Sequence, residues 1–361
     1  MYMFSELQFG IDLGTSNTII YQRGKGIVLQ EPSVIAVKQD TGEVLAIGSE
    51  AQAMIGRAPG NLEIIYPLQD GVISNYNWST AMLQHFMRKI QGRSWMRRSR
   101  VFISIPCGIT SVQKRAVEET VFQKGSNKAI TVEEPLAAAL GAGLPVDQPL
   151  GNMILNIGGG TSQVAILSLG GIVSSRTIRR GGMSIDRDII EYVKKTYSLD
   201  IGERTAEDIK IKLGTVVKPD PDVQLDIRGR DLVEGLPKTI TISSQEIYRL
   251  LDSFIGTLVD TIRATLEECP PELAGDVMEQ GIILCGGGSL LKGLNTRLQS
   301  DTHIPIYLAD QPLECTALGA GKMLDYDIRK LDRTRSSKSG SKGFQPDPLH
   351  ENEAVKQAAG D

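Results

Sequence analysis

Two segments of this chain share one pattern: an apolar strand, a glycine-containing turn and a second apolar strand. The first reads FGIDLGTSNTII (residues 9–20) and the second reads MILNIGGGTSQVAIL (residues 153–167). Glycine permits a tight turn, and the residues around it offer N–H and hydroxyl donors to phosphate oxygens. The candidate phosphate-binding residues are Gly14, Thr15, Ser16 and Asn17 in the first turn, and Gly158, Gly159, Gly160 and Thr161 in the second.

Either turn alone is also explained by an ordinary hairpin with a glycine bulge. The pair, with its similar flanks, predicts two β-hairpins that grip a phosphate chain from opposite sides. The strand before each turn ends differently, with Asp12 in the first copy and Asn156 in the second. The Asp12 carboxylate is placed to hold a metal ion through water.

The predicted order of strands and helices also occurs twice along the chain. Strands around the first turn lead to strands at 26–37 and 42–48, a helix near 77–90 and a strand at 100–106. A capping box formed by Thr110 and Gln113 begins a helix in which one face is expected to contain Val112, Ala116, Val117 and Val121. The second cycle has strands at 153–167 and 171–178, helices near 184–196, 205–213 and 244–267, and a strand at 281–287 followed by a helix over 289–300. This order predicts a duplicated α/β fold with a cleft between its halves.

Composition excludes several other classes of protein. The chain has 361 residues, 41% hydrophobic and 23% charged, with a net charge of −4, so it is not built to coat nucleic acid. Its four cysteines are far apart and without a CxxC pair, which disfavours zinc and indicates reduced thiols in a cytoplasm. No apolar run approaches the ~20 residues that span a bilayer, and the first residues do not resemble a signal peptide.

Two common nucleotide motifs are also missing from the sequence. GAGKM (residues 319–323) ends in methionine where a Walker A motif needs serine or threonine for magnesium, and Thr316 stands in place of its first glycine. No GxGxxG follows a strand, which disfavours a Rossmann dinucleotide site.

These residues resemble the actin-like ATPases, and among them the bacterial MreB/Mbl shape-determining filament proteins. The similarity covers about residues 8–328. It rests on the opening FGIDLGTSNTIIYQRGKGIVLQEPSVIAV and on later blocks in the family's order: IGRAPGNLEIIYPLQDGVI, VEEPLAAALGAGLPV, NMILNIGGGTSQVAILSLGGIV, IGERTAEDIKIKLG, GIILCGGGSLLKGL and PLECTALGAGKML.

The resemblance implies an actin-like two-lobed fold, with duplicated ribonuclease-H-like domains around a nucleotide cleft. We expect a first lobe over 1–150 with a small subdomain at about 33–75, and a second over 151–328 with a small subdomain at about 187–250. Residues 329–361 are polar and predict a disordered tail. The expected cofactors are ATP or GTP and Mg²⁺. The implied partners are other copies of the chain in paired protofilaments, the inner membrane surface and the membrane proteins of wall elongation.

The family's functional positions fall on named residues here. Glu134, directly before Pro135, matches the water-activating position; the alternative is a partner for the helix dipole, a role that Glu133 could also fill. Glu207 and Lys210 match the pair on the ribose and adenine side, or they form a solvated ion pair three residues apart. The last nucleotide loop, or else a plain strand-to-helix turn, comprises Gly286, Gly287, Gly288 and Ser289.

A basic loop, QGRSWMRRSR (residues 91–100), suggests contact with a membrane. Trp95 and Met96 are large apolar residues, and they are flanked by Arg93, Arg97 and Arg98. An aromatic side chain suits the bilayer interface, and arginines suit anionic headgroups. The family has a hydrophobic loop at a similar place. The alternative is that Trp95 packs locally while the arginines are solvated. The protein is therefore expected in the cytoplasm, peripheral at the inner face of the cell membrane.

Two departures from the family concern hydrolysis. Asn156 stands where the family usually has aspartate, so it can accept a hydrogen bond from a metal-bound water but brings no negative charge. Met183 and Ser184 replace acidic residues after a glycine pair, whereas Asp186 remains. We expect a membrane-associated filament protein that organises cell-wall synthesis and cell shape, with slow nucleotide hydrolysis.

Two other functions belong to the same superfamily. A chaperone-type ATPase needs a substrate-binding domain, and only a short polar segment follows Ile328. A sugar or acetate kinase needs a carboxylate base that faces a substrate hydroxyl, and the continuous MreB-like blocks argue against it.

Overall fold

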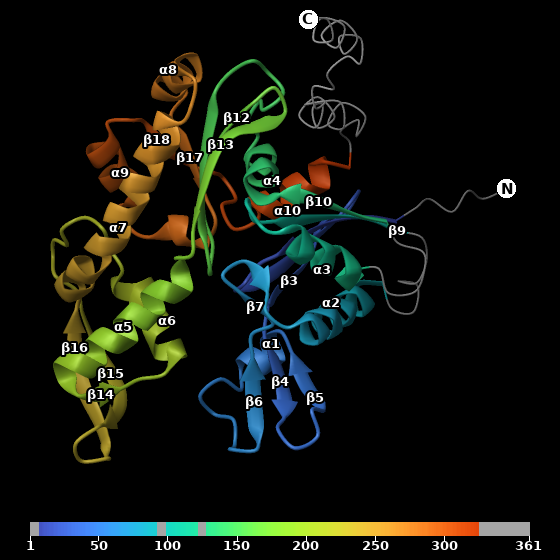
Figure 1. The fold of residues 1–361 in the computed structure, drawn as a ribbon. Coiled ribbons are helices and arrows are strands. Elements are labelled where there is room, and N and C mark those ends of the chain that lie inside the picture. The colour runs from blue at the N-terminus through green and yellow to red at the C-terminus, as the bar shows by residue number, and fades with distance from the viewer. Residues whose placement is uncertain (1–6, 92–98, 122–127, 325–361) are drawn as a thin grey trace, which may run out of the picture. The chain divides into compact units, whose positions relative to one another are not determined.

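The computed structural model describes residues 7–91, 99–121 and 128–324. Two five-stranded sheets dominate this part of the chain (Figure 1). The first has the order β10-β9-β1-β2-β3, with β1 (Leu7–Leu13), β2 (Asn17–Gln22), β3 (Gly26–Pro32), β9 (Ser99–Ile105) and β10 (Lys128–Glu133). The second has the order β13-β12-β11-β17-β18, with β11 (Asn152–Ile157), β12 (Ser162–Ser168), β13 (Gly171–Ile178), β17 (Ile282–Cys285) and β18 (Ile306–Leu308).

The two sheets have the same topology. β1 pairs antiparallel with β2 and parallel with β9. β11 likewise pairs antiparallel with β12 and parallel with β17. Each sheet therefore places its glycine turn at the end of a central strand. The duplication predicted from the sequence is present in the fold.

Two helices in close contact pack beside the first sheet. These are α4 (Glu134–Gly141) and α10 (Cys315–Lys322). A Cβ on Gly319 would lie 1.6 Å from the Ala137 carbonyl oxygen, and one on Gly141 would lie 1.8 Å from that of Cys315. Only glycine allows this approach. The last described helix therefore returns to the first half of the chain and supports α4, whose first residue is Glu134.

Two further helices of the first half are α2 (Tyr76–Gln91) and α3 (Ser111–Val121). The predicted capping box of α3 is confirmed: the Thr110 N–H donates to Gln113 Oε1 at 2.9 Å, and the Gln113 N–H donates to Thr110 Oγ1 at 3.2 Å. The predicted face of α3 is partly wrong. Val117 and Val121 are buried, but Val112 is 76% exposed.

The second half contains further helices besides α10. They are α5 (Gly182–Tyr197), α6 (Glu203–Leu213), α7 (Ser244–Glu267), α8 (Pro271–Gln280) and α9 (Leu294–Thr302). One face of α7 is buried, and it includes Leu251, Phe254 and Leu258. These side chains belong to the same hydrophobic core as residues of β11 and β17. The helix predicted over 289–300 begins later, at Leu294, and a short 3₁₀ turn, η2 (Gly287–Leu290), precedes it.

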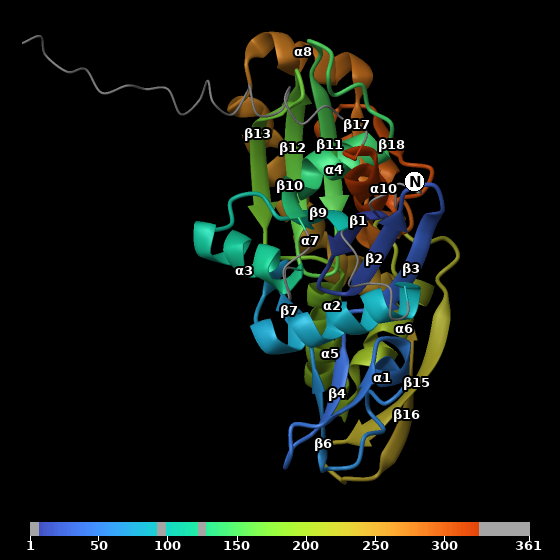
Figure 2. The same ribbon diagram turned by 90° about the vertical axis from the view of Figure 1, so that its right-hand side faces the viewer.

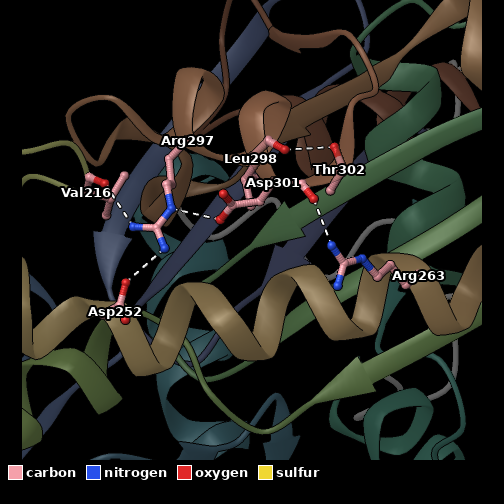
Figure 3. Close-up of polar contacts among 7 residues, drawn as sticks. All are labelled: Val216, Asp252, Arg263, Arg297, Leu298, Asp301 and Thr302. Atoms are coloured by element: carbon pink, nitrogen blue, oxygen red, sulfur yellow. Dashed lines mark hydrogen bonds and ion pairs between the residues drawn. The ribbon is translucent and has the colours of Figure 1, made fainter.

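Arg297 fixes α9 against its neighbours (Figure 3). Its guanidinium donates to Asp252 on α7 at 2.8 Å and to Asp301 on α9 at 2.7 Å. Arg263, also on α7, donates to the Asp301 carbonyl oxygen at 2.8 Å. The polar contacts therefore join α9 to two separate turns of α7.

Smaller sheets extend each half. One contains β4 (Ile35–Lys38), β5 (Val44–Ile47) and β6 (Leu62–Ile65), with α1 (Ser49–Gln52) beside it, and a hairpin of β7 (Leu68–Gln69) and β8 (Val72–Ile73) follows. The other contains β14 (Leu199–Asp200), β15 (Gln224–Asp231) and β16 (Pro237–Ser243). In both views the three-stranded sheets lie toward one end of the described chain, and α8 lies toward the other (Figures 1 and 2).

Candidate nucleotide site

The two glycine turns have the same internal hydrogen bond. The Gly14 N–H donates to the Asn17 carbonyl oxygen at 3.1 Å, and the Gly158 N–H donates to that of Thr161 at 2.8 Å. Ser33 further fixes the first turn, since its hydroxyl donates to the Gly14 carbonyl oxygen at 2.7 Å. Each turn is thus closed in the same way at the end of β1 or β11.

The turns also contact each other. A Cβ on Gly159 would lie 2.6 Å from Ser16 Cβ, and one on Gly160 would lie 2.6 Å from Thr15 Oγ1. The absence of side chains at these two glycines is therefore what lets the second turn approach the first. The structure brings together the two segments that the sequence predicted to grip one phosphate chain.

The first turn of α5 packs on the second glycine turn. The Gly182 and Met183 N–H groups donate to the carbonyl oxygens of Gly158 and Gly159, both at 2.9 Å. A Cβ on Gly181 would lie 2.4 Å from the Gly158 oxygen, so the glycine pair permits this contact. The segment RRGGM (residues 179–183) therefore packs against the second glycine turn and holds it through backbone hydrogen bonds.

A cavity of about 620 Å³ opens beside the two turns. This volume lies within the range of about 300–1,000 Å³ usual for small-molecule sites. Thr15, Ser16 and Gly160 line it from the turns, and Met183 and Asp186 line it from α5. Four of its polar side chains come from α6: Glu203, Arg204, Glu207 and Asp208. The Tyr66 hydroxyl, also in the lining, donates to Glu203 at 2.6 Å and joins the two halves across it.

Lys210 is held at the edge of this region by an ion pair. Its Nζ lies 2.7 Å from Asp186 Oδ2 and donates to the Gly182 carbonyl oxygen at 3.2 Å. The alternative interpretation, a solvated ion pair between Glu207 and Lys210, is wrong for Lys210, which pairs with Asp186 on α5 instead. Burial raises the pKa of Asp186 to about 6, although Lys210 opposes this shift. The other carboxylate oxygen of Asp186 is buried without a hydrogen-bond partner among the described residues.

Two carboxylates lie at the base of the turns. Burial raises the pKa of Asp12 to about 6, even though Ser104 donates a hydrogen bond to it at 2.9 Å. Burial and the nearby charge of Asp12 raise the pKa of Glu134 to about 8. The sequence predicted both residues for the site, and the structure brings them into electrostatic contact.

Two amides hold the Glu134 carboxylate. Asn156 Nδ2 donates to Glu134 Oε1 at 2.8 Å, and Gln163 Nε2 donates to Glu134 Oε2. Asn156 and Gln163 are directly opposite each other in the antiparallel pair of β11 and β12. Sequence reasoning missed Gln163. The available signal was a glutamine near the start of the strand SQVAILS, which is buried throughout.

The sequence predicts that the Asn156 side chain accepts a hydrogen bond from a metal-bound water. The structure gives this side chain other partners. Its NH₂ group faces Glu134, and its oxygen accepts a hydrogen bond from Cys285 Sγ at 3.4 Å. In the part of the chain that the structure describes, no three acidic, histidine or cysteine residues are grouped to coordinate a metal directly. The pair of Asp12 and Glu134 nevertheless fits a hydrated cation, since two neighbouring buried carboxyls would gain from a positive charge.

The last predicted loop packs against the end of β11. Gly286 has a φ of 79°, and a Cβ there would lie 2.6 Å from Asn156 Oδ1. Ser289 Oγ donates to the Gly286 carbonyl oxygen at 2.6 Å. The loop therefore contacts the residue that holds Glu134, and its contact with a nucleotide base stays a prediction.

The predicted membrane loop and polar tail lie outside the described residues. These comprise Arg93, Trp95, Met96, Arg97 and Arg98, and residues 329–361. Among the residues that the structure does describe, each helix is too short or too polar to cross a bilayer.

Known proteins share both the sequence and the arrangement of these elements. A family model described as MreB/Mbl protein matches residues 6–332. The chain belongs to the MreB/Mbl family. The cell shape-determining protein Mbl of Bacillus cereus is 46% identical over 316 residues, which cover 88% of this chain and 95% of that protein.

Solved structures of other proteins share the fold. MreB5 of Spiroplasma citri bound to AMPPNP matches with a TM-score of 0.86 at 35% identity, covering 92% of this chain and 99% of that one. MamK, in a structure described as a double helical filament, matches with a TM-score of 0.76 at 22% identity, covering 89% and 99%. The predicted family and actin-like α/β fold are confirmed, and neither the chaperone nor the kinase alternative is favoured.

Proposed function

We propose that this chain is a nucleotide-dependent filament protein that organises cell-wall synthesis and cell shape. The observation that carries the proposal is the contact of two glycine turns beside a cavity lined by Glu207. The relative from Bacillus cereus is named for determining cell shape, and MreB5 of Spiroplasma citri was solved with AMPPNP. The name of the first protein agrees with a role in cell shape, and the AMPPNP of the second agrees with a phosphate-binding cleft.

In this proposal the site residues have three roles: they bind the phosphates, contact the ribose and base, and hold the metal ion. Backbone N–H groups and hydroxyls of the two turns bind the phosphates of ATP or GTP, and Glu207 with Lys210 contacts the ribose and base. Asp12 would hold Mg²⁺ through water. The ion would supply positive charge beside the phosphates.

Glu134 is the proposed group that orients or deprotonates the attacking water. Burial and Asp12 raise the pKa of Glu134 to about 8. A general base works best when its pKa is near the operating pH, so this value suits a group that takes a proton from water. The donors on Asn156 and Gln163 fix both carboxylate oxygens. We propose slow hydrolysis, since Asn156, Met183 and Ser184 bring no negative charge to hold the hydrated ion.

Binding is tested by titrating a fluorescent ATP analogue into the purified chain with and without Mg²⁺. Gly160→Val should weaken binding about tenfold or more, because its side chain would strike Thr15 and hold the turns apart. Gly60→Val is a matched control, since a Cβ there meets nothing within 4 Å. Equal affinities for the parent and Gly160→Val would contradict the proposed phosphate site.

Slow hydrolysis is tested by phosphate release under polymerising conditions. The Asn156→Asp variant should release phosphate faster than the parent chain, because the new carboxylate helps to hold Mg²⁺. A parent chain that hydrolyses as fast as Asn156→Asp would reject impairment by Asn156. Nucleotide binding is measured in parallel, since the substitution also removes the amide that donates to Glu134.

We also propose that residues 91–100 attach the filament to the inner membrane surface, where it meets wall-elongation membrane proteins. The support is the sequence alone, in which Trp95 and Met96 are surrounded by arginines. A flotation assay with anionic vesicles compares the parent chain with a Trp95→Ser, Met96→Ser variant. Undiminished vesicle binding by the variant would reject this loop as the anchor.

A further inference from the structure

Two free cysteines lie where the chain returns from its second half to its first. Cys285 is the last residue of β17 in the second sheet. Cys315 is the first residue of α10, which contacts α4 and β1 of the first half. A covalent bond between these two side chains would therefore tie the second sheet to a helix that packs on the first half.

The connection from β18 to α10 runs along the end of β17. The Ala309 N–H donates to the Leu284 carbonyl oxygen at 3.0 Å, and the Gly286 N–H donates to the Pro312 carbonyl oxygen at 2.7 Å. One of these bonds is made by the residue before Cys285 and the other by the residue after it. The two backbone hydrogen bonds therefore hold the connection beside that cysteine.

The two thiols have partners in their surroundings and also interact with each other. Cys315 Sγ donates to the Gln311 carbonyl oxygen at 3.2 Å, and Cys285 Sγ donates to Asn156 Oδ1 at 3.4 Å. A hydrogen bond with Cys285 lowers the pKa of Cys315, although burial opposes this shift. Burial raises the pKa of Cys285 well above its usual range. Because the thiolate is the nucleophilic form, Cys315 is the thiol of this pair that reacts first.

Both thiols are enclosed by the fold, since Cys285 is 0% exposed and Cys315 2%. An oxidant therefore reaches them when the surrounding segment opens locally. Cys285 directly precedes Gly286, where the last predicted nucleotide loop begins. A nucleotide that binds this loop would favour the closed segment, so it should slow the oxidation of the pair.

We propose that Cys285 and Cys315 form a reversible disulfide when a hydroperoxide oxidises the chain, and that this bond slows the release of nucleotide. The first part of the inference depends on the two cysteines alone. The second part rests on the proposed nucleotide site, to which it adds a means of regulation.

The reaction takes place in two balanced steps. The Cys315 sulfur attacks the hydroperoxide, so an S–O bond forms while the O–O bond breaks, and hydrogen peroxide loses its other oxygen as water. The Cys285 sulfur then attacks the Cys315 sulfur, the S–S bond forms, and the S–O bond breaks to release a second water, which carries the proton of Cys285. Two thiols thus lose two electrons, and one peroxide gains them. Dithiothreitol reverses the product by thiol–disulfide exchange.

The disulfide should restrain the movement of the two halves. A nucleotide between the glycine turns leaves when the halves separate, and such opening steps often limit release. The bond would tie the second sheet to the first residue of α10, whose later residues contact α4 at Gly319 without room for a Cβ. We therefore expect release to slow about fivefold or more, which corresponds to about 1 kcal/mol of added cost for opening.

Peptide masses test the disulfide itself. Cys269→Ser is the starting chain, because tryptic peptide 264–292 contains both Cys269 and Cys285. After treatment with hydrogen peroxide and blocking of free thiols, this peptide should be joined to peptide 298–322, which contains Cys315. The joined pair should be two hydrogens lighter than the sum of its parts, the intact protein should keep the mass of one chain, and ATP should slow the reaction.

Nucleotide release is measured by chasing the bound fluorescent ATP analogue with excess ATP. Release from the oxidised starting chain should be about fivefold slower than from the reduced chain, and dithiothreitol should restore the rate. Cys315→Ser in the starting chain should release nucleotide at the reduced rate before and after peroxide, which also controls for oxidation of methionine. Cys107→Ser in the starting chain is the matched control, and it should respond to peroxide as the starting chain does.

The outcomes separate this inference from the proposed function. Peptides that stay unjoined, or that join between two chains or through Cys107, would overturn the disulfide. Unchanged release from a chain that contains the disulfide would overturn the regulation. A reduced starting chain that binds no nucleotide would contradict the proposed function, whereas the peptide masses would still decide the disulfide.

Discussion

At the scale of single residues, the environment of Glu134 governs the proposed chemistry. Burial and Asp12 favour its protonated form, whereas the amides of Asn156 and Gln163 favour the ionised form and fix its orientation. Hydrolysis requires the ionised Glu134 carboxylate to be oriented toward the attacking water. Asn156 and Gln163 therefore act as positioning residues.

Removing one of these donors should slow hydrolysis without preventing nucleotide binding. In Gln163→Leu, one Glu134 oxygen loses its donor, and we expect phosphate release to fall about tenfold to a hundredfold from misplacement of the base. The affinity for the ATP analogue should stay within about twofold. Ser168→Ala, on the same strand but bonded to the Gln148 carbonyl oxygen, is the matched control. Unchanged phosphate release in Gln163→Leu would show that Gln163 does not position Glu134.

Asp186 should make stability depend on pH. Its folded-state pKa of about 6 lies above the ordinary value of 3.8, so the folded protein takes up this proton at higher pH than the unfolded chain. The free energy of unfolding should therefore fall as pH rises from about 4 to about 6. Urea unfolding at both pH values should show a smaller fall for Asp186→Asn than for the parent chain. An equal fall in both would mean that Asp186 does not titrate in this range.

Much of the candidate site could be predicted from residue types, but its contacts could not. Asp12 and Glu134 stand next to recognisable segments, a glycine turn and a proline that begins a helix. Gln163 gained its role only when β11 and β12 paired in a register that places it opposite Asn156. Lys210 likewise pairs with Asp186 on another helix, a partner that spacing along one helix could not reveal.

At the scale of elements, α9 depends on Arg297 for its attachment to α7 (Figure 3). The side chain is only 24% exposed and donates to two carboxylates. Arg297→Met should lower the free energy of unfolding by about 1–2 kcal/mol, because charged hydrogen bonds are lost in a partly buried place.

The control for this prediction is Arg115→Met. Arg115 is 80% exposed and pairs with Glu119 on α3, so its loss should cost about 0.5 kcal/mol or less. Both values come from urea unfolding. Equal losses in the two variants would contradict a special role for Arg297.

The errors in the predicted helices have simple causes. Val112 lies nine residues before Val121, which is half a turn round the helix axis, so the two cannot share a face. The helix predicted over 289–300 is interrupted at Gly293, whose φ of 80° lies outside the helical region. The sequence contained both signals, whereas the packing that keeps Gly293 beside Val217 comes from the fold.

At the scale of the whole molecule, the duplicated sheets face one cavity with their glycine turns, so a nucleotide would bind both halves at once. A ligand that binds only the folded chain stabilises it by mass action. ATP with Mg²⁺ at about one hundred times its Kd should add about 2.7 kcal/mol and raise Tm. Gly160→Val should remove most of this increase, and an equal increase in that variant would contradict binding between the turns.

The central claim is that nucleotide in this cleft controls assembly. The most direct measurement is electron microscopy of the purified chain with and without ATP and Mg²⁺, together with the mass pelleted by centrifugation. We expect filaments with nucleotide, and few or none without it or with Gly160→Val. An absence of filaments in every condition, or equal filaments in all of them, would contradict it.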